Sequence, residues 1–346
     1  MTGKIAIEEH CAIEDTLRES AEYAVPGQLN VLERRLLDMD GERLAEMDKH
    51  GIAFAILSIN APGPQSVCDR ARAIDVARRG NDALAAAVAR HPDRYAGFAA
   101  LPMQDPDAAS AELTRAVKEL GFKGAMVNGF SQVGDPGTVV YYDDPIYRTF
   151  WATIAQLGVP FYLHPRDPLP SRTPSYDGHP WLTGASWAFG VETATHALRI
   201  MASGIFDVHP TLTVILGHLG EMLPYCIWRF DHRVTKRPRG IPARKTFTEY
   251  LRTNFYVTTS GNFHTPTLVD AVTELGADRV LFSVDYPFEE VADATSWFDK
   301  AEISEADRLK IGRTNAQRLF GLRTPGTSGT SGTSGTSGTS GTFGTS

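Results

Sequence analysis

Short apolar segments alternate with longer amphipathic segments along residues 1–322 of the chain. The short segments are mostly continuous apolar runs, which are typical of strands buried on both faces of a parallel sheet. The predicted strands are Ile5–His10, Ala53–Asn60, Tyr95–Leu101, Gly124–Asn128, Pro160–His164, Thr213–His218, Phe255–Thr259 and Val280–Asp285. Apolar residues at helical spacing predict helices over Leu36–His50, Ile74–Arg90, Ala108–Leu120, Ile146–Leu157, Val191–Ser203, Thr267–Leu275 and Leu309–Leu319.

This alternation predicts an α/β fold with a parallel sheet, and eight strands are the number in a (β/α)₈ TIM barrel. A doubly wound open sheet is the alternative. Asp105 and Pro106 supply an N-cap and a first-turn proline for one predicted helix, and Ser304–Asp307 resembles a capping box before another. The segments Gly129–Tyr142 and Arg166–Trp187 are rich in Gly, Pro and Asp, and we expect them to form long loops over the barrel mouth.

Polar side chains interrupt the apolar strands at the ends where a barrel opens. Glu8 and His10 close the first predicted strand. His164 closes the fifth strand, and Asp285 closes the eighth. Residues two apart in a strand face the same side, so Glu8 and His10 point into the mouth together while Glu9 faces away. The strand ends of a barrel converge, and two imidazoles with two carboxylates suit Zn²⁺ or Mn²⁺.

Each of these side chains has an ordinary structural explanation when it is taken alone. A single histidine in a buried strand is more often a hydrogen-bonded core residue than a ligand, and a charge at a strand end is usually solvated. Their joint occurrence at matching positions favours a metal site, because burying several charged groups together without a cation leaves unpaired charge at a high cost in free energy.

A second polar group follows the sixth predicted strand. His218 ends that strand, and Glu221 lies three residues further on, close enough to orient the imidazole if a helix begins there. The pair is either a proton carrier beside the metal or a helix-capping polar pair. Arg229 either contacts an anionic substrate group or forms an ion pair with Asp231. Asn128, at the end of the fourth strand, is a candidate polar contact in the pocket.

Composition narrows the classes of protein. The 346 residues carry a formal net charge of −7, which argues against a nucleic-acid partner. No apolar run approaches the ~20 residues of a membrane span, and acidic residues near the start argue against a signal peptide, so we expect a cytoplasmic protein with no membrane partner. Three scattered cysteines are too few for a disulfide framework. No glycine-rich phosphate loop follows a predicted strand, so the sequence does not indicate nucleotide binding. Residues 323–346, a Thr/Ser/Gly repeat, are expected to be a flexible tail after a single domain of residues 1–322.

Four motifs carry a resemblance to a known family. They are Ile7-Glu8-Glu9-His10, Phe161-Tyr162-Leu163-His164-Pro165, Ile215-Leu216-Gly217-His218-Leu219-Gly220-Glu221 and Leu281-Phe282-Ser283-Val284-Asp285-Tyr286-Pro287. From Lys4 to about Leu322 the chain resembles the amidohydrolase superfamily. Within it the chain is similar to the non-oxidative decarboxylases of aromatic acids, first to the γ-resorcylate (2,6-dihydroxybenzoate) group and then to the salicylate and 2,3-dihydroxybenzoate groups.

The resemblance implies a TIM barrel of the amidohydrolase type, assembled as a homotetramer or homodimer. It implies one divalent metal ion, Zn²⁺ or Mn²⁺, and no organic cofactor. The implied ligands are Glu8, His10, His164 and Asp285. The implied reaction is the reversible, non-oxidative decarboxylation of an ortho-hydroxybenzoate, a small aromatic carboxylic acid, with 2,6-dihydroxybenzoate giving resorcinol and CO₂.

The same resemblance implies roles for the remaining polar residues. Asp285 is expected to protonate the ring, and His218, held by Glu221, to bond a substrate oxygen or relay the proton. Substrate contacts are expected from Arg229, Asn128 and Tyr23. A metal-dependent hydrolase of a lactone, ester or amide is the alternative enzyme, and a non-catalytic scaffold is the alternative outside catalysis.

Overall fold

The structure is a computed structural model that describes residues 1–18, 21, 24 and 26–322. Its long-range parallel strands are β1 (Lys4–Cys11), β2 (Ile52–Ile59), β3 (Tyr95–Gly97), β4 (Ala125–Asn128), β7 (Phe161–His164), β8 (Val214–Leu216), β9 (Phe255–Thr258) and β10 (Val280–Leu281). Each of them overlaps one of the predicted strands, so the strand predictions are confirmed, although several strands are shorter than expected.

The parallel strands form a continuous ring in chain order. Strands β1 to β3 pair in one sheet, and β4, β7, β8, β9 and β10 pair in another. Ala99 pairs with Ala125 at one junction of the two sheets, and Glu9 pairs with Tyr286 at the other. The backbone N–H of His10 donates to Tyr286 O at 2.6 Å across this second junction. The predicted (β/α)₈ barrel is therefore confirmed.

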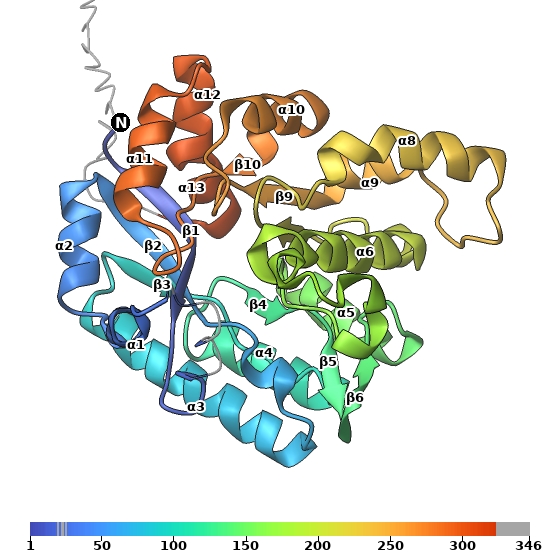
Figure 1. The fold of residues 1–346 in the computed structure, drawn as a ribbon, viewed down its shortest axis with the longest axis horizontal. Helices are drawn as coiled ribbons and strands as arrows, with labels where there is room; N and C mark the ends of the chain where they lie inside the picture. Colours follow the sequence, from blue (N-terminus) through green and yellow to red (C-terminus); the bar gives the residue numbers. More distant parts are fainter. Residues whose placement is uncertain (19–20, 22–23, 25, 323–346) are drawn as a thin grey trace, which may run out of the picture.

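Helices surround the strand ring, as Figure 1 shows. They are α1 (Leu29–Leu37), α2 (Glu42–Lys49), α3 (Arg70–Arg90), α4 (Pro106–Lys118), α5 (Arg148–Leu157), α6 (Ala188–Ala202), α7 (Ile205–Val208), α8 (Leu223–Lys236), α9 (Phe247–Asn254), α10 (Thr265–Leu275), α11 (Val291–Lys300), α12 (Glu305–Leu309) and α13 (Asn315–Phe320). Asp105 caps α4 as expected, because its side chain accepts hydrogen bonds from the N–H groups of Asp107 and Ala108. Within the described residues, every helix is too short or too polar to cross a lipid bilayer.

Two large apolar clusters pack the inside of the ring and the layer between strands and helices. Ile5, Ile7 and Phe98 belong to the inner cluster, where Phe320 of α13 packs 5.6 Å from the Phe98 ring. Ala6 belongs to the outer cluster. Because side chains fill the barrel interior, polar groups on the strands can gather only at the mouth.

Some predicted elements are wrong in detail. The predicted helix Leu36–His50 is two helices, because the Asp38 carboxylate accepts hydrogen bonds from the N–H groups of Gly41 and Arg43 and begins a new helix there. The predicted loop Gly129–Tyr142 contains the antiparallel hairpin β5 (Ser131–Val133) and β6 (Asp135–Val140).

Other differences concern helices near the end of the chain. Lys310–Thr314 forms a π-helical turn that interrupts the predicted helix Leu309–Leu319. Helices α7, α8, α9 and α11 had no counterpart among the predicted helices. Tyr23 and the tail 323–346 lie outside the described residues, so their predicted roles stay predictions.

Candidate metal centre

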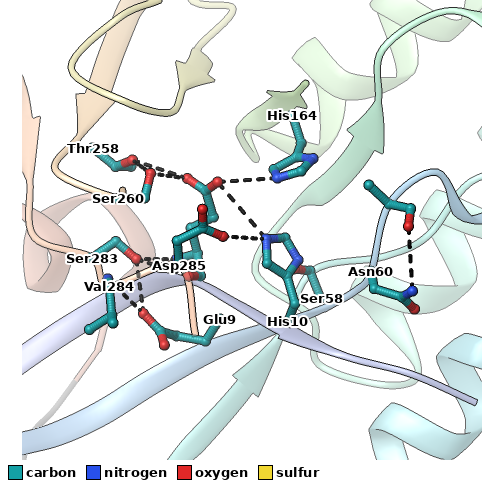
Figure 2. A network of polar contacts seen from close by, with 12 residues as sticks. Glu9, His10, Ser58, Asn60, His164, Thr258, Ser260, Ser283, Val284 and Asp285 are labelled. Carbon is teal, nitrogen blue, oxygen red and sulfur yellow. Dashed lines mark hydrogen bonds and ion pairs between the residues drawn. The ribbon is translucent and has the colours of Figure 1, made fainter. Parts of the chain in front are cut away.

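The four predicted ligands meet at the barrel mouth. Each of them offers one ligand atom, and these atoms all lie within 4.8 Å of one another. His10 Nε2 is 3.1 Å from Asp285 Oδ1, and His164 Nε2 is 3.2 Å from Glu8 Oε1. Figure 2 shows His10, His164 and Asp285 directed toward a common point. Strands β1 and β7 and the segment after β10 therefore bring together residues that are up to 277 positions apart (285 − 8 = 277).

Buried ligand atoms face this point. Glu8 Oε1, His10 Nε2 and Asp285 Oδ1 are buried, and none of them forms a hydrogen bond with a described residue outside the ligand cluster. Buried polar atoms are rarely left in this state unless an unseen group satisfies them. Two carboxylates and two imidazoles at this spacing match the nitrogen and oxygen donors that Zn²⁺ and Mn²⁺ accept, so the residues fit a divalent cation.

Hydroxyl groups orient the Glu8 carboxylate. Its Oε2 accepts hydrogen bonds from Tyr162 of β7, from Ser260, and from Thr258 of β9 at 3.2 Å. Three donors on one oxygen leave Oε1 to face the ligand cluster. On the other side, Ser58 Oγ lies 3.3 Å from His10 Nδ1 and fixes that ring. Partners of this kind hold metal ligands in place.

The ionisation of the ligands also suits a cation. Burial opposes ionisation of Glu8, yet the positive charge of His218 and hydrogen bonds from the ligand histidines hold the Glu8 pKa well below its usual range. Burial also opposes ionisation of Asp285, but hydrogen bonds from His10 and His218 lower its pKa. Burial alone would lower the pKa of His10, whereas Asp285 and Glu8 raise it to about 9. A cation would replace the positive charge that the imidazoles supply here.

His218 and Glu221 form the predicted pair beside the ligands. Glu221 Oε1 lies 2.7 Å from His218 Nδ1, and His218 Nε2 lies 3.4 Å from Asp285 Oδ2. His218, Leu219, Glu221 and Met222 all have positive φ, between 51° and 67°. The Leu219 N–H donates to Thr258 O at 2.7 Å and ties this strained turn to β9. Strain of this kind is typical of functional sites, and the turn aims the imidazole at Asp285 rather than capping a helix.

A cavity of about 770 Å³ opens beside His218. Trp187, Phe189 and Leu219 line it together with Gly261. Gly261 has a φ of +59°, and a Cβ there would meet His218 Cδ2 at 3.0 Å, so a larger residue at this wall would be strained and would crowd the imidazole. A cavity of this size accommodates a small aromatic molecule.

Asn128 lies beside His164 in the parallel pairing of β4 and β7. Its side chain is buried, and its Oδ1 has no hydrogen-bond partner among the described residues. This amide oxygen is therefore available to a hydrogen-bond donor, and the predicted contact of Asn128 with a substrate stays a prediction.

Arg229 does not reach the ligand cluster within the described chain. It is exposed on α8 and lines a separate groove of about 640 Å³ with Arg233 and Arg237. The alternative ion pair with Asp231 is not formed in the described residues, because the Asp231 carboxylate accepts hydrogen bonds from the start of α9, including the Phe247 N–H at 2.7 Å.

The hydroxyl donors to Glu8 were missed in the sequence. One pattern could have found Tyr162: it lies two residues before His164 in a short strand and therefore shares its face. Thr258 and Ser260 likewise lie two apart at the end of a predicted strand. Hydroxyl residues on the inward face of strands that carry ligands are thus a usable pattern for supporting groups.

Comparisons with known proteins assign the chain to a family. Residues 27–322 match the family model described as Amidohydrolase, so the chain belongs to the amidohydrolase family. Within that family it is 59% identical over 325 residues to the γ-resorcylate decarboxylase of Rhizobium radiobacter, a match that covers 93% of this chain and 99% of that protein. The resemblance found in the motifs is therefore confirmed.

Solved structures agree with this placement. A crystal structure of a 2,6-dihydroxybenzoate decarboxylase complexed with 2,6-dihydroxybenzoate is 57% identical, with a TM-score of 0.92 over 93% of this chain and 100% of that one. A dihydroxybenzoic acid decarboxylase from Polaromonas sp. JS666, with bound manganese and the inhibitor 2-nitroresorcinol, is 56% identical, with a TM-score of 0.91 over 93% of this chain and 98% of that one.

Proposed function

We propose that the chain is a carboxy-lyase that catalyses the metal-dependent, non-oxidative decarboxylation of 2,6-dihydroxybenzoate to resorcinol and CO₂. The observation that carries the proposal is the ligand cluster with His218 Nε2 3.4 Å from Asp285 Oδ2, beside a cavity of about 770 Å³. The γ-resorcylate decarboxylases and the structure with bound 2,6-dihydroxybenzoate support the choice of substrate.

The proposed ligands are Glu8, His10, His164 and Asp285. When bound, the cation supplies Lewis acidity that holds a substrate carboxylate and favours the phenolate form of its ortho hydroxyl. We propose Mn²⁺ or Zn²⁺ as the ion, since the donor set suits both and the Polaromonas relative holds manganese. No organic cofactor is required in this scheme, because protonation of the phenolate ring gives a dienone that accepts the electrons of the breaking C–C bond, as an organic electron sink would otherwise do.

The chemistry needs a proton delivered to the ring carbon. Direct loss of CO₂ from a benzoate leaves a ring carbanion without conjugation, whereas an ortho phenolate raises the electron density on the carbon that bears the carboxylate. Asp285 Oδ2 is the proposed donor to that carbon, since Asp285 Oδ1 faces His10 and Oδ2 faces His218. Once the carbon is protonated, the C–C bond breaks, its electrons restore the aromatic ring and CO₂ leaves.

His218 is the proposed reservoir for this proton. Burial lowers its pKa, but the charges of Glu221 and Glu8 and the hydrogen bond to Asp285 raise it well above the usual value. The proton therefore rests on the imidazole and passes to Asp285 Oδ2 when the substrate carbon accepts it. Each step is reversible, so excess bicarbonate with resorcinol is expected to give the carboxylated product. Asn128 is proposed to accept a hydrogen bond from a substrate hydroxyl through its Oδ1, which has no partner among the described residues.

We also propose that the enzyme is a homo-oligomer. Tyr225 and Trp228 on α8 are 84% and 67% exposed, and α8 extends away from the barrel in Figure 1. Exposed aromatic residues grouped on one helix are typical of protein interfaces. A second copy packed on this face would surround Arg229, which supports its proposed role at a substrate rather than in solvent. Light scattering of the purified protein distinguishes a dimer from a tetramer.

The test is a substrate screen with the purified, metal-supplemented protein. We expect resorcinol and CO₂ from 2,6-dihydroxybenzoate at a higher kcat/KM than from salicylate or 2,3-dihydroxybenzoate. A panel of lactones, esters and amides is run in parallel. Hydrolysis of any of these without CO₂ release from the benzoates would overturn the proposal in favour of a metal-dependent hydrolase.

A further inference from the structure

Glu9 is a buried acid between two proposed ligands, and the proposed reaction leaves it without a role. It is 5% exposed. Its Oε1 accepts a hydrogen bond of 3.0 Å from the Ser283 hydroxyl and another of 3.0 Å from the Val284 N–H. Figure 2 shows Glu9 joined to Ser283 and Val284, apart from His10 and His164. Glu9 thus joins the strand that carries Glu8 and His10 to the residues directly before Asp285.

Strict alternation along β1 would put the proposed ligands on the wrong face. Ile5 and Ile7 pack inside the ring and Ala6 packs outside it. If the alternation continued, Glu9 would point inward, and Glu8 and His10 would point outward. The register of β1 against β2 instead shifts between Ala6 and Glu9. This irregularity, a β-bulge, turns the two proposed ligands toward the mouth.

Ser283 satisfies the backbone of this bulge. The N–H groups of Ile7 and Glu8 are consecutive, and both donate to Ser283 Oγ, at 3.1 Å and 2.6 Å. In a regular ladder consecutive N–H groups point to opposite neighbours, so the bulge needs an acceptor in this position. The Asp285 N–H donates to Glu8 O at 3.1 Å, so these contacts form a seam between β1 and the segment Ser283–Asp285.

Arg43 of α2 closes the seam from outside the ring. Its Nη2 donates to His10 O at 2.5 Å, and its guanidinium lies 4.6 Å from the centroid of the Tyr286 ring. It therefore touches the residues on either side of the junction between β1 and the segment after β10. Glu9, Ser283 and Arg43 together hold this junction.

We propose that Glu9 and Ser283, which we term the seam pair, are positioning residues for the metal centre. They keep the bulge in β1 and thereby set the spacing between Glu8, His10 and Asp285. The inference rests on the proposed metal centre and does not depend on which reaction the centre catalyses. Supporting groups of this kind typically change metal affinity about 10- to 100-fold.

The test measures how firmly the Mn²⁺-loaded enzyme holds its ion against a chelator. For Ser283→Ala and Glu9→Ala we expect the apparent Kd for Mn²⁺ to rise about 10- to 100-fold. Glu9→Gln keeps a side-chain oxygen that accepts the same two hydrogen bonds, so it is expected to restore most of the affinity lost in Glu9→Ala. The electron paramagnetic resonance spectrum of bound Mn²⁺ is expected to broaden in the two alanine variants only.

The matched control is Ser131→Ala. Ser131 is also fully buried, and its hydroxyl bonds to Tyr142 rather than to the seam. It is expected to lower the melting temperature without changing the Kd for Mn²⁺. Circular dichroism checks the fold, and Ser283→Ala decides the result if Glu9→Ala fails to fold.

Two outcomes distinguish a failure of the seam-pair proposal from a failure of the proposed metal centre. If the parent chain does not bind Mn²⁺ or Zn²⁺, the metal centre itself is overturned. If the parent binds and folded Ser283→Ala binds within about twofold of it, only the seam pair is overturned.

Discussion

The ligand cluster at the barrel mouth and the exposed face of α8 are built in different ways. Glu8 and His10 are fully buried, and neighbouring strands supply hydrogen bonds that hold them. By contrast, Tyr225, Trp228 and Arg229 project from α8 into solvent. The residues of the ligand cluster are held by contacts within one chain, whereas the side chains on α8 are left exposed to solvent.

This difference indicates which parts of the molecule suit metal binding and which suit substrate selection and assembly. A sheet fixes side chains through ladders that cannot shift without breaking several hydrogen bonds, so it suits metal ligands whose spacing must be kept. A projecting helix and its loops vary more easily and suit substrate selection and assembly. Substitutions in the ligand cluster and on α8 should therefore affect metal binding and assembly separately.

The largest effect is expected for Asp285→Asn, since it removes both a ligand charge and the proposed proton donor. Turnover should fall at least about 10³- to 10⁴-fold, because an amide cannot deliver the proton. Metal content, measured by mass spectrometry, should fall as well. Full turnover of the variant with 2,6-dihydroxybenzoate would rule out Asp285 as the donor.

His218→Asn should separate chemistry from metal binding. We expect turnover to fall about 10²- to 10³-fold, because the proton reservoir is lost. The metal content should stay near that of the parent, since His218 lies beside the ligand cluster and outside it. A variant that lost its metal along with its activity would place His218 among the ligands.

The stability of the metal-free protein and its affinity for the metal should change with pH in opposite directions. In the metal-free chain Asp285 and Glu8 raise the pKa of the buried His10 to about 9. The stability that comes from charged His10 is complete below about pH 6.5 and is lost as the pH rises to about 9. Metal binding needs the neutral imidazole, so metal affinity should rise about tenfold per pH unit over the same range.

Melting curves with and without a chelator measure this difference. Between about pH 6.5 and 9 the melting temperature of the metal-free protein should fall, while the increase caused by Mn²⁺ should grow. A metal-free melting temperature that rises with pH in this window would contradict the assignment of charged His10.

Ser260→Ala tests the hydroxyl donors to Glu8. It removes one of three hydrogen bonds to Oε2, so the Kd for Mn²⁺ should rise about tenfold and turnover at saturating metal should change little. Thr295→Val is the control, since that buried hydroxyl bonds within α11 at Val291 O. An unchanged Kd in Ser260→Ala would mean that the remaining donors suffice.

The smallest effect on metal binding is expected for Trp228→Arg. This residue is exposed in one chain, so neither the fold nor the Kd for Mn²⁺ should change. The molar mass by light scattering should fall if a second copy covers α8. An unchanged mass would show that assembly uses another face.

Much of the fold and all four residues of the ligand cluster could be predicted from the sequence, because they depend on patterns within short segments. Continuous apolar runs marked the strands, and polar residues at their ends marked the mouth. His164 and Asp285 could be found because an ionisable group is rarely placed in a buried strand without a partner. The helix Leu36–His50 was predicted wrongly because its apolar spacing continues across Asp38, whose side chain bonds backbone N–H groups and ends the first helix.

The facing of Glu8 and His10 shows the limit of that reasoning. The alternation of side chains along a strand correctly placed Glu8 and His10 on one face and Glu9 on the other. The same alternation, continued from Ile5 and Ile7, would have turned Glu8 and His10 away from the mouth. The shift between Ala6 and Glu9 decides the matter, and it depends on Ser283, which lies far along the chain and is adjacent only in the closed ring.

Residue types and their periods in the sequence determined which elements form and which side chains are able to bind a cation, because these are properties of short segments. Only the tertiary structure decided how β1 bulges, which hydroxyls hold Glu8, and that Arg229 stands apart from the ligands on α8. These features depend on contacts between segments that are distant in the chain, and the free energy of such contacts leaves no periodic trace in either segment alone.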